Sequence, residues 1–115
     1  MEYLALIHAN ESDWAALTDA ERQAVYERYG DFGRRDEVVG GAELESTSSA
    51  TTVRVRNGDR LVTDGPYAEV KEALGGYYIL ECNSIDEACR LAAVLPEPDY
   101  NVAIEIRPVY VREES

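Results

Sequence analysis

Two side chains of this sequence, His8 and Asp64, are the first candidates for acid–base chemistry. His8 is the single histidine, and an imidazole can gain or lose a proton near neutral pH. Asp64 is followed by Gly65, which permits turn conformations, and by Pro66, which fixes φ. We therefore predict His8 and Asp64 as catalytic residues. The alternatives are a hydrogen-bonded interior or rim histidine and a carboxylate that only caps its own turn.

Arginines and tyrosines are the candidates for substrate binding. Arg54 and Arg56 fall in a predicted strand, and a guanidinium can hold a carboxylate through two parallel hydrogen bonds. Tyr67 and Tyr77 supply aromatic walls and hydroxyl donors for a small organic molecule. Cross-strand Arg–Glu pairs and simple packing of the tyrosines are the alternative explanations.

The sequence lacks the usual signatures of metal and cofactor sites. One histidine and two separated cysteines, Cys82 and Cys89, do not form a recognisable metal-binding pattern. A P-loop, a glycine-rich dinucleotide motif and a Gly-x-Ser-x-Gly elbow are absent from the sequence. We therefore expect no metal and no cofactor. Both cysteines are expected to be buried thiols in a reducing cytosol.

Length and charge limit the class of protein. A chain of 115 residues, of which 45% are hydrophobic, is long enough to bury a core as one domain, residues 1–115. The net charge of −12 argues against binding to nucleic acid or to an anionic membrane surface. No leader-like segment or long apolar run is present, so we expect a cytoplasmic protein.

The first half of the chain must position His8. Residues 2–8 predict a strand that is apolar on both faces, which favours a homodimer in which a second copy covers one face. Residues 10–17 predict a turn or short helix, and the capping pattern of Thr18 and Glu21 begins the main helix. We expect this helix to end before Gly40, and residues 42–45 to form a short strand.

The second half must position Asp64. Residues 51–56 and 60–63 alternate around Asn57-Gly58, which predicts a hairpin that delivers Asp64 to a loop. A strand is predicted over residues 76–82 and another over 102–109. Between them, Ser84 and Glu87 begin a helix that reaches about Leu95. Its predicted apolar stripe consists of Ile85, Ala88, Cys89, Ala92 and Leu95. The predicted order is β-α-β, hairpin, β-α-β, an α+β sandwich.

The segment DGPYAEVKEALGGYY, residues 64–78, resembles the signature of DGPF-domain proteins in the YCII-related superfamily, with Tyr67 in place of phenylalanine. The similarity extends nearly from end to end, including the strand before the signature and the Glu-Ile-Arg-Pro ending. It implies a ferredoxin-like βαββαβ fold with an inserted β-hairpin and a dimeric α+β barrel with facing sheets. In the YCII branch, a proposed His–Asp pair has its histidine early in the first helix, and the predicted helix of this chain has none there.

Three functions remain open from the sequence. The first is a cofactor-free enzyme that acts on a small organic molecule in a dimer-bounded cavity. The second is a ligand-binding or regulatory accessory module, which the resemblance connects with alternative sigma factors. The third is a structural dimer without a ligand. Neither the substrate nor the presence of catalysis follows from the residues.

Overall fold

The computed structural model of the chain describes residues 1–96 and 102–112. The strands are β1 (Glu2–Ala9), β2 (Val38–Glu43), β3 (Thr51–Arg56), β4 (Asp59–Asp64), β5 (Ala73–Glu81) and β6 (Val102–Pro108). The helices are α1 (Glu11–Ala16), α2 (Asp19–Gly33) and α3 (Ile85–Ala92), with a 3₁₀ turn, η1, at Thr47–Ser49. No helix of the described residues is both long and apolar enough to cross a membrane.

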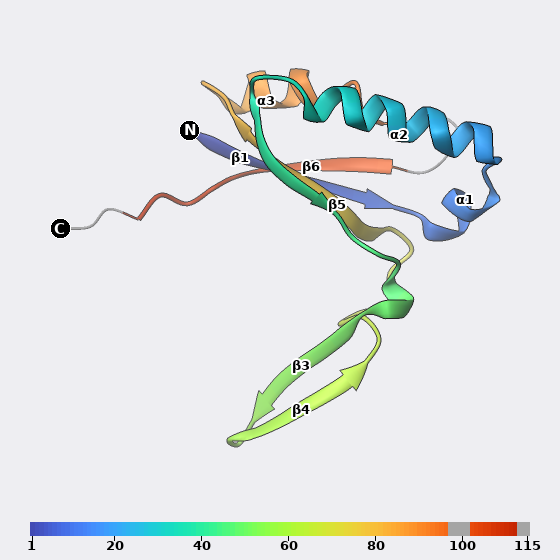
Figure 1. The fold of residues 1–115 in the computed structure, drawn as a ribbon. Helices are drawn as coiled ribbons and strands as arrows, with labels where there is room; N and C mark the ends of the chain where they lie inside the picture. Colours follow the sequence, from blue (N-terminus) through green and yellow to red (C-terminus); the bar gives the residue numbers. More distant parts are fainter. Residues whose placement is uncertain (97–101, 113–115) are drawn as a thin grey trace.

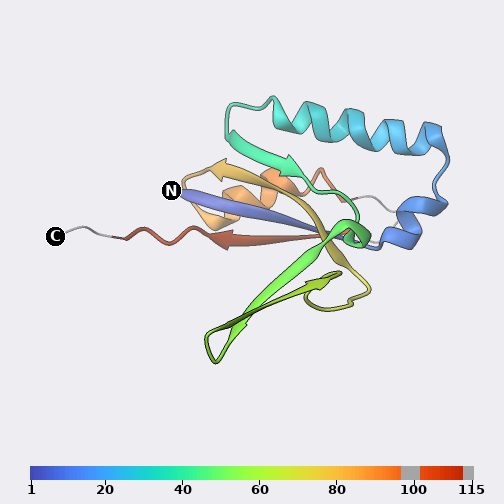
Figure 2. The ribbon, with the colours of Figure 1, turned by 60° about the horizontal axis from the view of Figure 1, so that its bottom comes forward.

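Four strands form one antiparallel sheet in the order β2-β5-β1-β6. Strand β5 lies between β1 and β2, as it must when two β-α-β units interlock in a ferredoxin-like fold. Figures 1 and 2 show α2 and α3 on the same face of this sheet. The predicted α+β, ferredoxin-like architecture is therefore confirmed.

Strands β3 and β4 form a separate two-stranded hairpin, inserted between β2 and β5. Its turn residues have positive φ angles, 52° at Asn57 and 82° at Gly58, as a two-residue type I′ turn requires. Figure 1 shows the hairpin on the side of the sheet opposite the helices. The radius of gyration is 16.4 Å, against about 13 Å for a compact domain of this length, and the projecting hairpin accounts for much of the excess.

Local capping begins each helix. Thr18 Oγ1 accepts a hydrogen bond from the Glu21 amide, and the Glu21 carboxylate accepts one from the Thr18 amide. Ser84 caps α3 by accepting from the Glu87 amide. Asn10 caps α1 in the same way. These bonds satisfy amides that the first turn of a helix leaves without partners, so both predicted N-caps start helices as expected. Only Thr18 and Glu21 form a complete capping box, because the Glu87 carboxylate accepts from the Asn83 amide and not from Ser84.

The core lies between the sheet and the helices. Phe32 of α2, Leu80 of β5 and Leu95 are the largest fully buried side chains. Ala5 of β1 and Ala88 of α3 are completely buried beside them, and these small residues allow the helices to pack closely on the sheet.

Several predicted boundaries are wrong. Helix α2 ends at Gly33, in agreement with the prediction that it ends before Gly40, but the strand predicted at residues 42–45 instead covers Val38–Glu43. The reason is tertiary, because β2 gains a ladder of hydrogen bonds with β5 that its glycines do not predict. Helix α3 stops at Ala92.

The predicted burial of α3 also needs correction. Leu91 is buried, whereas Cys89 and Ile85 are exposed. The predicted stripe therefore lies partly on the solvent side. Only Cys82 is a buried thiol, and burial raises its pKa.

Candidate functional site

His8 lies near the end of β1, on the same sheet face as Leu4 and Leu6 and opposite the helices. Its Nε2 atom is 3.0 Å from Glu105 Oε1 on the neighbouring strand β6. A carboxylate at this distance can orient the imidazole and stabilise its protonated form. The structure therefore gives His8 a carboxylate partner, and that partner is Glu105.

Asp64 is the last residue of β4, and its side chain is exposed without a hydrogen bond to any described residue. The turn after it is held by other groups. The Gly65 amide donates to the Ala50 carbonyl over 2.7 Å, and Thr52 Oγ1 donates to the Gly65 carbonyl over 2.8 Å. Asp64 thus neither caps its own turn nor contacts His8.

The candidate arginines belong to the hairpin and not to the four-stranded sheet. The Arg54 guanidinium carbon lies 5.3 Å from the centre of the Tyr67 ring, a cation–π contact that joins two of the candidate residues. Arg56 is opposite Asp59 beside the hairpin turn. Tyr77 is elsewhere, on β5, where it contributes to the wall of a cavity.

This cavity, of about 720 Å³, lies between the helical layer and the sheet. It is bounded by α1, α2, the ends of β2 and β5 and the connector that follows β2. Its wall is largely apolar and aromatic, with principal contributions from Trp14, Val25, Tyr26, Tyr29 and Tyr78. Its size and lining are typical of binding sites for small organic molecules, which occupy roughly 300–1,000 Å³.

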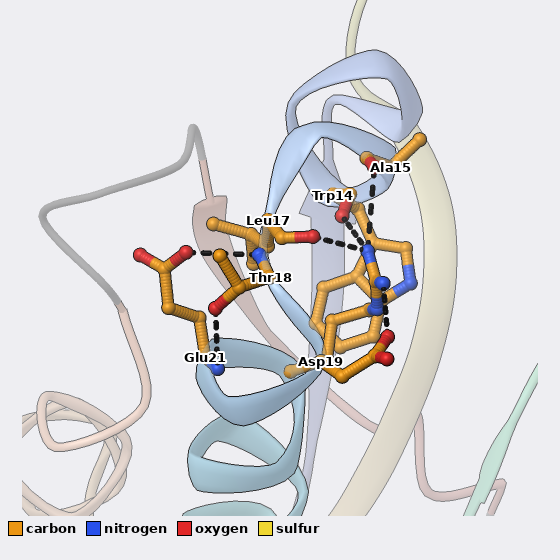
Figure 3. A network of polar contacts seen from close by, with 7 residues as sticks. Trp14, Ala15, Leu17, Thr18, Asp19 and Glu21 are labelled. Atoms are coloured by element: carbon orange, nitrogen blue, oxygen red, sulfur yellow. Dashed lines mark hydrogen bonds and ion pairs between the residues drawn. The ribbon is translucent and has the colours of Figure 1, made fainter.

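A network of polar contacts holds the corner between α1 and α2 that carries Trp14 (Figure 3). Most of these contacts are made by Arg22. Its guanidinium donates to the Trp14, Ala15 and Leu17 carbonyls over 3.2, 3.3 and 2.6 Å. It also pairs with Asp19. Because these carbonyls end a helix of only six residues, one side chain supplies partners that the helix itself lacks. Trp14 is thereby held against Tyr26, with ring centres 5.4 Å apart and edge to face.

The connector after β2 is fastened to α1. Glu11 accepts hydrogen bonds from the Thr47 amide and the Thr47 hydroxyl, over 2.8 and 3.0 Å. This contact joins residues 36 positions apart and holds the connector that contributes Leu44 and Ser46 to the cavity wall. The cavity rim is therefore built from segments that the sequence keeps apart.

Two glycines permit the close approach of β2 to β5 beside the cavity. A Cβ atom on Gly41 would lie 2.6 Å from the Tyr77 carbonyl oxygen, and one on Gly76 would lie 2.9 Å from that of Ala42. Both neighbours are backbone atoms, so a side chain at either position would force the strands apart. Of the two glycines that obscured β2 in the sequence, Gly41 is thus required by the pairing with β5.

Glu43 gives this apolar site a charged group. The Tyr26 hydroxyl donates to Glu43 Oε1 over 3.3 Å. Burial, and then the nearby Glu43 carboxylate, raise the pKa of the Tyr26 phenol, and the same two causes raise the pKa of Tyr78. The Tyr78 hydroxyl donates to the Tyr29 carbonyl over 2.8 Å. Both phenols are consequently neutral donors near neutral pH, and the carboxylate lies close to both.

Most of this wall is absent from the residues that sequence reasoning selected. Trp14, Tyr26 and Glu43 were missed because their positions fit ordinary packing or surface roles. The sequence signal available was the aromatic content of residues 14–29, but periodicity does not separate a packed core from a cavity wall.

The fold is that of a ferredoxin-like α+β protein with a cavity between its helices and its sheet. Residues 1–112 match the family model of the YCII-related domain, and the chain belongs to this family. A protein of Rhizobium meliloti (strain 1021), named as an uncharacterised protein, is 34% identical over 117 residues. That similarity covers 95% of this chain and 92% of the relative.

Proposed function

We propose that this YCII-related protein binds a small, mainly apolar organic molecule in the cavity between helices α1 and α2 and the sheet. The observation that carries the proposal is an aromatic-walled space of about 720 Å³ with a carboxylate and phenols at fixed positions. Apolar walls supply the affinity by excluding water, and a few fixed polar groups orient the ligand. A binding protein without turnover would act as a ligand-responsive accessory module.

Blocking the cavity tests this proposal. Ala15 is exposed and lines the cavity, whereas its neighbour Ala16 is exposed and does not line it. Ala15→Phe should therefore fill part of the space, and Ala16→Phe is the matched control. We expect aromatic compounds to shift amide resonances around Trp14 and Tyr26, and to bind at least about tenfold more weakly to Ala15→Phe. Equal binding by both variants would place the compounds outside the cavity and contradict the proposal.

A cofactor-free enzyme is the second candidate, favoured by the His8–Glu105 contact of 3.0 Å. We propose that His8 acts as the acid–base group, oriented by Glu105, in a space bounded by the open sheet faces of a homodimer. The hairpin projects on that side of the sheet (Figure 1), and Asp64, Arg54 and Arg56 would reach the space from it. The test is turnover by the wild type and its loss in His8→Gln, with the fold checked by circular dichroism. Undiminished turnover in His8→Gln would exclude the role of His8.

A further inference from the structure

The charged residues among the described lining of the cavity are all acidic. Glu11, Glu43 and Glu45 contribute to its wall, and none of the described lining residues is lysine, arginine or histidine. Glu11 is already occupied by the amide and hydroxyl of Thr47. A ligand of compatible charge is therefore neutral or cationic, because a bound anion would meet carboxylates without a counter-charge from the wall.

Glu43 retains capacity to accept hydrogen bonds. Among the described residues its side chain accepts one hydrogen bond, from the Tyr26 hydroxyl over 3.3 Å, whereas an ionised carboxylate has about four lone-pair positions. Glu43 is opposite Gly76 in the β2–β5 ladder and two residues from Gly41, which is opposite Tyr78. Strand alternation puts Glu43 and Gly41 on one face, toward α2. The raised pKa values of Tyr26 and Tyr78 are consistent with its negative charge on that side.

Aromatic rings stand beside this carboxylate. Tyr26 contacts both Glu43 and Trp14, and the Tyr29 and Tyr78 rings are 6.4 Å apart in the same wall. Tyr26 and Glu43 are both accessible from solvent, so a ligand can reach them. Electron-rich rings attract ammonium groups, and a nearby carboxylate adds a direct charge-assisted bond. Neither feature favours a neutral or anionic head group.

We propose that the cavity is selective for an organic cation, an amine or substituted ammonium on an apolar body, with Glu43 as its counter-charge and Trp14 and Tyr26 as aromatic walls. This inference rests on the proposed function, since it names the class of ligand for the same cavity. It also assigns Glu43 as the residue that determines specificity.

Three probes with similar bodies and different head groups test the selectivity: phenylbutylamine, phenylbutanol and phenylbutyrate. Their affinities are measured near neutral pH by amide chemical shifts and by the fluorescence of Trp14, the single tryptophan. We expect the amine to bind at least about tenfold more tightly than the alcohol, which corresponds to about 1.4 kcal/mol, and the carboxylate to bind most weakly.

Glu43→Gln should reduce the preference for the amine to less than about threefold, because the amide oxygen still accepts from Tyr26 but the charge is gone. Glu2→Gln is the matched control, since Glu2 is exposed and does not line the cavity. It should retain the full preference despite the same change in net charge. If Glu43→Gln does not fold, the head-group preference of the wild type decides the question.

The outcomes separate the two proposals. Binding in the cavity without preference for the amine, or a preference unchanged in Glu43→Gln, would overturn the cation inference and leave small-molecule binding intact. If none of the three probes shifts resonances of the cavity wall, both proposals fail.

Discussion

The Tyr26 hydroxyl of α2 donates to the Glu43 carboxylate of β2 over 3.3 Å, joining the helical layer to the edge strand of the sheet. Both side chains belong to the cavity wall. The contact also puts a negative charge near two phenols, Tyr26 and Tyr78, whose pKa values burial and this charge raise. The same carboxylate therefore links α2 to β2 and raises the pKa values of both phenols.

Alkaline pH should destabilise the protein through these phenols. Because the pKa values of Tyr26 and Tyr78 are raised, the folded protein retains both protons more tightly than the unfolded chain does. Their contribution is fully present below about pH 10, the ordinary tyrosine pKa, and is lost as pH rises through the raised values. Denaturant unfolding across this range should show a shallower fall in stability for Tyr78→Phe than for the wild type. Tyr67→Phe, which removes a phenol that is 78% exposed, is the control. Identical slopes for Tyr78→Phe and the wild type would contradict the prediction.

Gly58→Val should weaken the hairpin alone. Gly58 has φ of 82°, a conformation that costs other residues about 1–2 kcal/mol and a β-branched residue more. Because β3 and β4 form their own sheet, hydrogen exchange of their amides should accelerate at least about tenfold while the main sheet changes little. Asn57→Gly, which keeps positive φ accessible, is the control. Unchanged exchange in the hairpin of Gly58→Val would show that the turn does not limit its stability.

The open face of the sheet should form a homodimer. Leu4 and Ile79 are directly opposite one another on this face, and Leu6 lies two residues along β1 from Leu4. All three are only partly buried in the single chain. Light scattering at micromolar concentration should therefore give a dimer for the wild type and a monomer for Leu6→Glu. Ile85→Glu introduces the same charge at an exposed site on α3 and should remain dimeric. A monomeric wild type would exclude this assembly.

Asp64→Asn separates a functional carboxylate from a structural one. The side chain is exposed and makes no hydrogen bond with a described residue, so the free energy of unfolding should change by no more than about 0.5 kcal/mol. If Asp64 serves the proposed enzyme, turnover should fall while thermal stability is retained. A large loss of stability would instead make Asp64 a structural residue.

Local chemistry made much of the fold predictable. The Thr18 and Ser84 caps, the Asn57-Gly58 turn and the alternation of β3 each depend on neighbouring residues, and each forms as expected. Strand β2 was harder to predict, because Gly40 and Gly41 disfavour a strand locally. The close approach of Gly41 to Tyr77 becomes necessary only once β5 is beside it.

The cavity depends on contacts that no spacing in the sequence encodes. Glu11 meets Thr47 across 36 positions, and Tyr26 meets Glu43 across 17. By contrast, His8 was selected by residue type alone, and its carboxylate partner, Glu105, is 97 positions away. Side-chain type identified candidates, but tertiary structure determined which of them meet.

A crystal structure of the protein with the tightest-binding of the three phenylbutyl probes tests the central claim most directly. Small-molecule binding in the helix–sheet cavity predicts ordered ligand density against Trp14 and Tyr26, with the head group of a bound amine beside Glu43. Ligand density beside His8 and Glu105 on the open sheet face, with the helix–sheet cavity empty, would contradict that claim.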